Sequence, residues 1–231
     1  MPRSTPAPAA IAAIAAIAFD LDGTLVDSAP DISDALNFAL AKEGLAPFDV
    51  MQVIQWVGDG PDALIDRALA RHGLPAPDRT TLQRVRAAYD EQALRAPLGR
   101  GQLFPGITEL LATLDGRWPL AVVTNKPPDL ALAVLASAGI ASRFVTVHGP
   151  NRRQERKPEP FMLLAAAEQL GVATTSLLMV GDSLADLGAA AAAECPVAYA
   201  LWGYGKEGAL QRHPGAFVLE RPDDLLSLLR H

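Results

Sequence analysis

The feature that most constrains this chain is a pair of aspartates directly after an apolar run. Residues 15–19 read Ala-Ala-Ile-Ala-Phe, and Asp-Leu-Asp-Gly-Thr-Leu-Val-Asp-Ser follows at 20–28. A short continuous apolar run bounded by turn residues predicts a buried strand of a parallel sheet. Carboxylates at the end of such a strand are costly as structure, but Asp20 and Asp22 would suit a nucleophile and its acid–base partner. A plain turn would also use Asp and Gly, but it does not need this order of residues.

Strand-like and helix-like segments alternate through the second half of the chain. This alternation is typical of a doubly wound parallel sheet, so we predict an α/β fold. The predicted strands cover 119–123, 143–147, 176–180, 196–200 and 216–219, and the predicted helices cover 128–138, 160–170, 185–194 and a last segment from 222.

The stretch from about 29 to 101 has a different character, with helical patterns and no convincing strand. Gly and Pro residues punctuate it, as expected between helices. We predict a helical domain of residues 29–102 inserted into a catalytic core of residues 1–28 and 103–231. The helical patterns run over 32–43, 50–56, 62–71 and 80–95.

Composition narrows the function. The chain has 231 residues, 50% of them hydrophobic, and a net charge of −6, which favours a globular protein and argues against a nucleic-acid surface. Cys195 stands alone, so no intrachain disulfide can form and a reducing compartment fits. No later apolar run approaches the ~20 residues of a membrane span. We expect a cytoplasmic protein, monomeric or homodimeric, that binds neither membrane nor nucleic acid.

The apolar N-terminus could be taken for a secretion signal. Cleavage near Ala16 or Ala18 would remove the strand that presents Asp20, so we do not expect one. We expect residues 1–12 to be a frayed lead-in.

Polar residues lie after four of the predicted strands, where the carboxyl ends of parallel strands form a ligand crevice. We therefore expect them to meet. Taken singly, each has an ordinary explanation as a helix cap, a first-turn acid or a solvated lysine. The residues are Asp20 and Asp22 after the first strand, Thr124 and Asn125 after the second, Lys157 after the third, and Asp182, Ser183 and Asp186 after the fourth.

The chemistry that needs such a set is phosphoryl transfer. Carboxylates and a phosphate can share a crevice only with cations, so we expect a hard divalent cation such as Mg²⁺ on Asp20 and Asp182. Lys157 adds a positive charge, and Thr124 adds a phosphate donor beside backbone N–H groups. Asp20 would attack phosphorus, and Asp22 would protonate the leaving oxygen and then activate water.

With these motifs the chain resembles the haloacid dehalogenase-like hydrolases, and among them the phosphoglycolate phosphatases. The resemblance implies a Rossmann-like core, a helical cap, and Mg²⁺ held by the Asp20 carboxylate, the Asp22 backbone carbonyl and Asp182. Asp186, with Ser183 beside it, would support the metal waters or Lys157. The motifs are Asp-x-Asp-Gly-Thr at 20–24, Thr-Asn at 124–125, Lys-Pro at 157–158 and Gly-Asp-x-x-x-Asp at 181–186, and further shared stretches lie at 56–60, 103–106, 123–127 and 202–205.

The resemblance also separates related activities. Dehalogenases of the family lack the second aspartate and ion-pumping ATPases carry Thr there, so Asp22 favours hydrolysis of a phosphoenzyme. A phosphonatase needs a cap lysine for a Schiff base, whereas Lys42 reads as solvated at the end of a helix. A mutase of the same fold stays open.

Two loops bear on the substrate. Gly58 and Gly60, before Pro61, could place backbone N–H groups near an anion, with Asp59 turned away; the alternative is an ordinary helix–helix turn. The loop 148–156 carries three arginines where the family often has a less basic sequence, which either attracts anions or is simply solvated.

We therefore expect a Mg²⁺-dependent phosphatase acting on a small phosphorylated metabolite through an aspartyl-phosphate. The leading substrate is 2-phosphoglycolate. The alternatives are a phosphatase for another sugar or sugar-acid phosphate, a phosphomutase, and a non-catalytic binding module, against which the complete acid pair argues.

Overall fold

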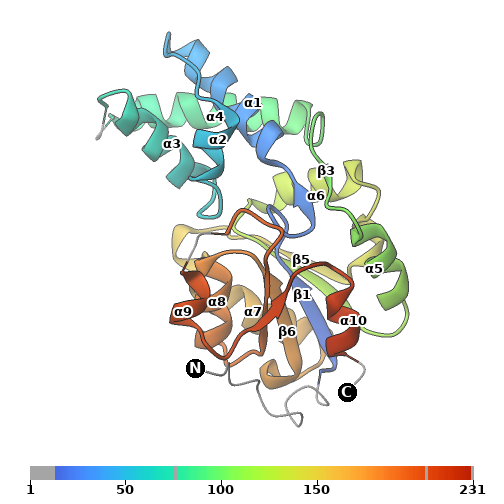
Figure 1. Cartoon of the computed structure of the whole chain (residues 1–231). Helices are drawn as coiled ribbons and strands as arrows, with labels where there is room; N and C mark the ends of the chain where they lie inside the picture. Colours follow the sequence, from blue (N-terminus) through green and yellow to red (C-terminus); the bar gives the residue numbers. More distant parts are fainter. Residues whose placement is uncertain (1–13, 75–76, 206–207, 230–231) are drawn as a thin grey trace.

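The main body of the molecule is a six-stranded parallel sheet with helices on both faces (Figure 1). The computed structural model describes residues 14–74, 77–205 and 208–229. The strand order β5-β4-β1-β6-β7-β8 confirms the predicted α/β fold with a doubly wound, Rossmann-like sheet. The strands are β1 (Ala16–Phe19), β4 (Leu120–Val123), β5 (Thr146–His148), β6 (Leu177–Gly181), β7 (Val197–Ala200) and β8 (Phe217–Leu219).

The two faces of the sheet pack differently because successive side chains of a strand point to opposite sides. On β1, Ile17 and Phe19 belong to an apolar cluster with bulky residues of one helical layer. Ala16 and Ala18 belong to the other cluster, where small alanines let the helices approach closely. The first layer contains α5 (Ile107–Leu114), α6 (Pro128–Ser137) and α10 (Asp224–Leu228), and the second contains α7 (Phe161–Leu170) and α8 (Leu184–Ala192).

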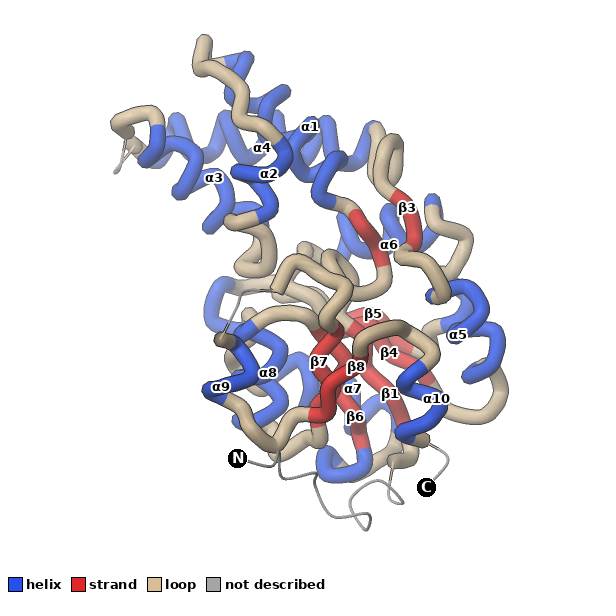
Figure 2. The backbone as a smooth tube through the Cα atoms, viewed as in Figure 1, coloured by secondary structure: helices blue, strands red, loops and turns tan. Residues whose placement is uncertain are grey.

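The helices described between residues 29 and 95 form a second body beyond the carboxyl ends of the strands (Figures 1 and 2). We call residues 29–95 the helical unit. It has an apolar core of its own, including Leu36, Leu40, Ile65 and Leu69. The helices are α1 (Ala29–Lys42), α2 (Val50–Ile54), α3 (Pro61–Arg71) and α4 (Arg79–Arg95).

The chain enters and leaves the helical unit through two short strands, β2 (Val26–Asp27) and β3 (Gln102–Leu103). They pair antiparallel, with Val26 opposite Leu103. The division into a core of 1–28 and 103–231 and a cap of 29–102 stays a prediction, which the separate apolar cores support.

The structure corrects one predicted strand. Residues 143–147 were expected to be extended, but Ala141–Arg143 forms a 3₁₀ helix, Phe144 packs into the core, and β5 begins at Thr146. Further elements that the sequence analysis did not name are α5, β2, β3, the short helix α9 (Ala209–Arg212) and 3₁₀ helices at Arg153–Glu155 and Thr174–Ser176.

The apolar segment near the N-terminus provides the central strand β1, as predicted. The expected lead-in at residues 1–12 lies outside the described residues. Among the described helices, none combines the length and the apolar character that crossing a bilayer requires.

Candidate active site

The four strands that carry the predicted site residues are neighbours in the order β5-β4-β1-β6. Asp20 follows β1, Thr124 follows β4, Asp182 follows β6, and the loop after β5 leads to Lys157. All four residues are buried. The structure therefore brings together side chains that lie up to 162 residues apart in the chain, from Asp20 to Asp182.

Lys157 lies at the centre of the site. Its Nζ lies 2.9 Å from Asp20 Oδ1 and 2.6 Å from Asp186 Oδ1, and it donates to the carbonyl of Val123 at 2.8 Å. These three acceptors match the three N–H donors of an ammonium group. Burial lowers the pKa of Lys157, but the two carboxylates outweigh it and raise the pKa above its ordinary value. Lys157 therefore carries a positive charge into an otherwise acidic site.

Asn125 fixes the loop that carries Lys157. Its Oδ1 accepts the backbone N–H of Lys157 at 2.8 Å, and its Nδ2 donates to the Lys157 carbonyl at 3.0 Å. The same Nδ2 donates to the carbonyl of Gly58 at 2.9 Å. Both amide hydrogens are thus used by the protein, and one of them joins the sheet edge to the helical unit.

Three carboxylates gather beside Lys157. Ligand oxygens of Asp20, Asp182 and Asp186 lie within 4.8 Å of one another. Burial raises the pKa of Asp20 to about 7; Asp186 and Asp22 add to the effect and Lys157 opposes it. Burial, with the charges of Asp186 and Asp20, also raises the pKa of Asp182 well above its ordinary value. Hard oxygen donors that repel one another in this way fit a divalent cation, which would favour their charged forms.

Asp182 is held tightly in this cluster. Its Oδ1 accepts from Thr24 Oγ1 at 3.0 Å, and its Oδ2 accepts the backbone N–H of Tyr204 at 2.7 Å. Gly23 and Gly203 approach it so closely that a Cβ on either would overlap the Asp182 side chain. These contacts, made by residues distant in the sequence, thus hold the Asp182 carboxylate in one position.

Asp186 was expected to support either the metal waters or Lys157, and in the structure it contacts Lys157. Its Oδ2 accepts the backbone N–H of Ser183 at 2.9 Å and the Ser183 hydroxyl at 2.6 Å. Ser183 is also the N-cap of helix α8. The helix cap that we considered as an alternative to a site role is therefore present together with that role. The two roles are compatible.

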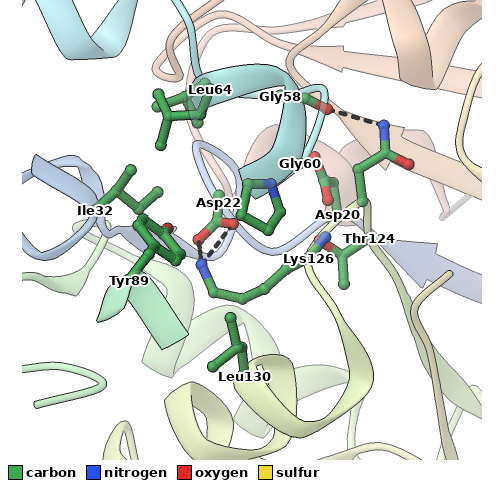
Figure 3. Close-up of a pocket in the computed structure, with 13 residues that line it drawn as sticks. Asp20, Asp22, Ile32, Gly58, Gly60, Leu64, Tyr89, Thr124, Lys126 and Leu130 are labelled. Carbon is green, nitrogen blue, oxygen red and sulfur yellow. Dashed lines mark hydrogen bonds and ion pairs between the residues drawn. The ribbon is translucent and has the colours of Figure 1, made fainter. Parts of the chain in front are cut away.

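Asp22 has a partner that the sequence analysis did not assign. Lys126 Nζ lies 2.8 Å from both carboxylate oxygens of Asp22 (Figure 3). Ser28 donates its hydroxyl to Asp22 Oδ1 at 2.5 Å. Both lysine and aspartate side chains are about nine-tenths buried, at 9% and 12% exposure. The sequence feature that could have indicated this partner is the position of Lys126 directly after the predicted site residues Thr124 and Asn125.

Asp22 and Lys126 face a partly open pocket with a cavity volume of about 30 Å³. The pocket lies between the sheet edge and the helical unit, and its walls are mostly apolar (Figure 3). It is lined by Asp20, Asp22, Thr124, Asn125 and Lys126 from the core, Ile32, Val57, Gly58, Gly60, Pro61, Leu64 and Tyr89 from the helical unit, and Leu130 of α6.

The loop before α3 closes this pocket. Gly60 has a φ of +81°, and a Cβ there would lie 2.8 Å from the Asn125 carbonyl, so this close approach needs glycine. Gly58 contacts Asn125 through its carbonyl. Asp59 pairs with Arg67 and does not line the pocket, which is the orientation expected for it.

The basic loop divides into two parts. Arg152 and Arg153 are exposed, as in the solvated interpretation. Arg156 instead reaches the helical unit, where it pairs with Asp62. Burial would raise the pKa of Asp62, but the hydrogen bonds and charges of Arg156 and Arg86 outweigh it and lower the pKa. The loop thus provides a second contact between core and helical unit.

Comparison with known proteins agrees with this geometry. A family model described as a haloacid dehalogenase-like hydrolase matches residues 14–194, which include every predicted site residue. The chain belongs to this family. It is therefore an enzyme of the hydrolase class.

Similar members of the family carry phosphatase names. A phosphoglycolate phosphatase from Rhodospirillum rubrum is 41% identical over 83% of this chain and 81% of its own length. One from Pectobacterium atrosepticum is 35% identical over 96% and 95%. The crystal structure of a predicted phosphoglycolate phosphatase from Haemophilus somnus matches with a TM-score of 0.85 and 29% identity over 93% and 97%. The structure of CbbY from Rhodobacter sphaeroides, in complex with phosphate, matches with a TM-score of 0.79 and 26% identity over 94% and 100%.

Proposed function

We propose that this hydrolase is a Mg²⁺-dependent phosphatase that cleaves a small phosphate monoester through an aspartyl-phosphate on Asp20, with 2-phosphoglycolate as the leading substrate. The observation that carries the proposal is the buried Asp20 carboxylate, held by Lys157, with Asp22 facing the same pocket. The relatives named phosphoglycolate phosphatase support the substrate.

The acidic cluster supports the cation. We assign Mg²⁺ to the Asp20 carboxylate, the Asp22 backbone carbonyl and Asp182, with Asp186 holding Lys157. A bound Mg²⁺ would neutralise part of the charge on the phosphate and on its attacking carboxylate.

The chain's own residues account for the bond changes. An Asp20 oxygen forms a bond to phosphorus while the bond from phosphorus to the leaving oxygen breaks, and Asp22 gives that oxygen a proton. Water then attacks the same phosphorus and passes a proton to Asp22, which releases phosphate and restores Asp20. Thr124 and the backbone N–H of Asn125 hold phosphate oxygens, and Lys157 adds a positive charge beside them. The Asn125 side chain keeps Lys157 in place.

The helical unit acts as the cap. It closes the pocket with Gly58, Gly60 and apolar side chains, which excludes bulk water from the aspartyl-phosphate. Lys42 pairs with Glu91 and is about half exposed, away from the pocket, so it offers no Schiff-base chemistry. This observation favours a phosphatase over a phosphonatase.

The test is phosphate release from a panel of small monoesters, with and without Mg²⁺. We expect release by the wild type to need Mg²⁺, with 2-phosphoglycolate preferred by kcat/KM. Asp20→Asn should lose at least about 10³-fold in kcat because it removes the nucleophile. Asp129→Asn, which changes an exposed carboxylate on α6, is the matched control.

Each alternative has its own outcome. Mg²⁺-dependent release with another preferred monoester would keep the reaction and change the substrate. Isomerisation without phosphate release would indicate a mutase. No conversion of any compound would refute the proposed function.

A further inference from the structure

We propose that Lys126 selects the substrate by binding an anionic group, of the carboxylate class, on the carbon next to the phosphate ester. The inference rests on the proposed function and deepens it, because it assigns the side of the site that holds the leaving group. Asp20, Thr124 and Lys157 account for the phosphate end, and none of them recognises the rest of the molecule.

The position of Lys126 follows from its contact with Asp22. Its Nζ lies 2.8 Å from each Asp22 oxygen, and Asp22 is the group that reaches the leaving oxygen in the proposed reaction. The ammonium therefore lies within about two hydrogen-bond lengths of that oxygen. A carboxylate separated from the ester oxygen by a single carbon has the reach to meet it.

Lys126 has a donor available for such a group. An ammonium has three N–H donors, and within the described chain Nζ of Lys126 contacts no acceptor other than the two Asp22 oxygens. Lys157, in contrast, is surrounded by three protein acceptors. The two lysines thus have different tasks: Lys157 is fixed in the acidic cluster, and Lys126 faces the pocket.

The other residues that line the pocket also favour an anionic group at Lys126. Of the described residues lining the pocket, Lys126 is the only one with a cationic side chain. Ile32, Leu64, Leu130 and the ring of Tyr89 lie around it (Figure 3). An anion buried among these apolar groups needs the charge of Lys126, because an unpaired buried charge is strongly unfavourable. The small volume of the pocket also favours a short carbon chain.

Binding without turnover tests this assignment. The two probes are 3-phosphonopropanoate, in which CH₂ replaces the ester oxygen of phosphoglycolate, and propylphosphonate, which has a methyl group in place of the carboxylate. Calorimetric titration in the presence of Mg²⁺ gives the ratio of their dissociation constants. We expect the wild type to prefer the carboxylated probe by at least about tenfold, the value of one charge-assisted hydrogen bond.

Variants of Lys126 test whether its positive charge causes the preference for the carboxylated probe. Lys126→Gln keeps a hydrogen-bond donor toward Asp22 but loses the charge, so the preference should fall to less than about threefold, and Lys126→Arg should restore part of it. Lys42→Met is the control, because Lys42 lies on the helical unit away from the pocket. Thermal denaturation of each variant reports whether it is folded.

Three results would overturn the inference: a wild type that binds both probes equally, a Lys126→Gln protein that keeps the preference, or an equal loss of both probes, which would mean that Lys126 only positions Asp22. Failure of the proposed function would look different. The wild type would then release no phosphate from any monoester, whatever its preference between the two phosphonates.

Discussion

The hydroxyl of Tyr204 donates a hydrogen bond to Asp27 Oδ1 at 2.6 Å. The same hydroxyl accepts the backbone N–H of Ala29 at 2.9 Å, and the backbone N–H of Tyr204 donates to Asp182. Burial and the hydrogen bond to Asp27 raise the pKa of Tyr204, so the phenol keeps its proton and remains a donor. One residue therefore connects the acidic cluster with the first turn of the helical unit.

Replacing Tyr204 with Phe removes the side-chain contacts and keeps the backbone one. Asp27 and the Ala29 N–H lose their partner, so the free energy of unfolding should fall by about 2 kcal/mol, which thermal denaturation would show as a decrease of several degrees in Tm. Mg²⁺ affinity, measured by titration, should change less than about threefold because the Asp182 contact remains. An unchanged Tm would contradict this view of Tyr204.

Gly203→Ala should weaken Mg²⁺ binding by at least about tenfold, because the new Cβ would overlap Asp182 and displace its carboxylate. Gly215→Ala is the matched control, since a Cβ at Gly215 meets no neighbouring atom. Calorimetric titration of both variants with Mg²⁺ makes the comparison. Equal affinities would show that this close packing does not position Asp182.

Lys157→Met should cost about 3–5 kcal/mol of stability, because it leaves Asp20 and Asp186 buried without their counter-charge. Adding Asp186→Asn removes one of these charges and should recover part of the loss in denaturant unfolding. Activity should be absent in both variants. Full activity in the double variant would argue against a phosphate-binding role for Lys157.

The raised pKa of Asp20 predicts a pH dependence of stability for the metal-free protein. The carboxyl titrates near its ordinary 3.8 when unfolded and at about 7 when folded, so between these values the folded state binds more protons. Stability should therefore fall as pH rises from about 4 through 7. Tm measured in chelator from pH 5 to 8 should show this slope in the wild type and a smaller one in Asp20→Asn. Added Mg²⁺ should stabilise the wild type more at pH 8 than at pH 5, and the opposite order would refute the assignment.

The sequence predicted those parts of the fold and site that depend on local pattern. The apolar run before Asp20 predicted β1, and the topology of a parallel sheet then placed Asp182 and Lys157 near it. The strand expected at 143–147 is present as β5 but begins three residues later, because apolar residues alone do not distinguish β5 from the packed Phe144 that precedes it. Helix α5 was not predicted, although its apolar residues have the spacing of an amphipathic helix, at Ile107, Leu110, Leu111 and Leu114.

Other features depend on contacts between distant residues. Lys126 follows the predicted pair Thr124 and Asn125, but its partner Asp22 lies 104 residues earlier and is brought to it only by the fold. The Tyr204 hydroxyl forms a hydrogen bond with Asp27, 177 residues away in the chain. The sequence around neither residue predicts this contact. Such partners follow from tertiary packing, which motif spacing does not encode.

The pairing of β2 with β3 has a consequence for how this enzyme can change over evolution. Because Asp27 and Gln102 lie opposite each other, the chain leaves the core and returns to it at adjacent points. The backbone path of the core at this point therefore does not depend on the length of the segment inserted between those strands. We expect that an insertion of another size could replace the helical unit while Asp20 keeps its position after β1, so that a different leaving group could be accommodated at the same reacting carboxylate.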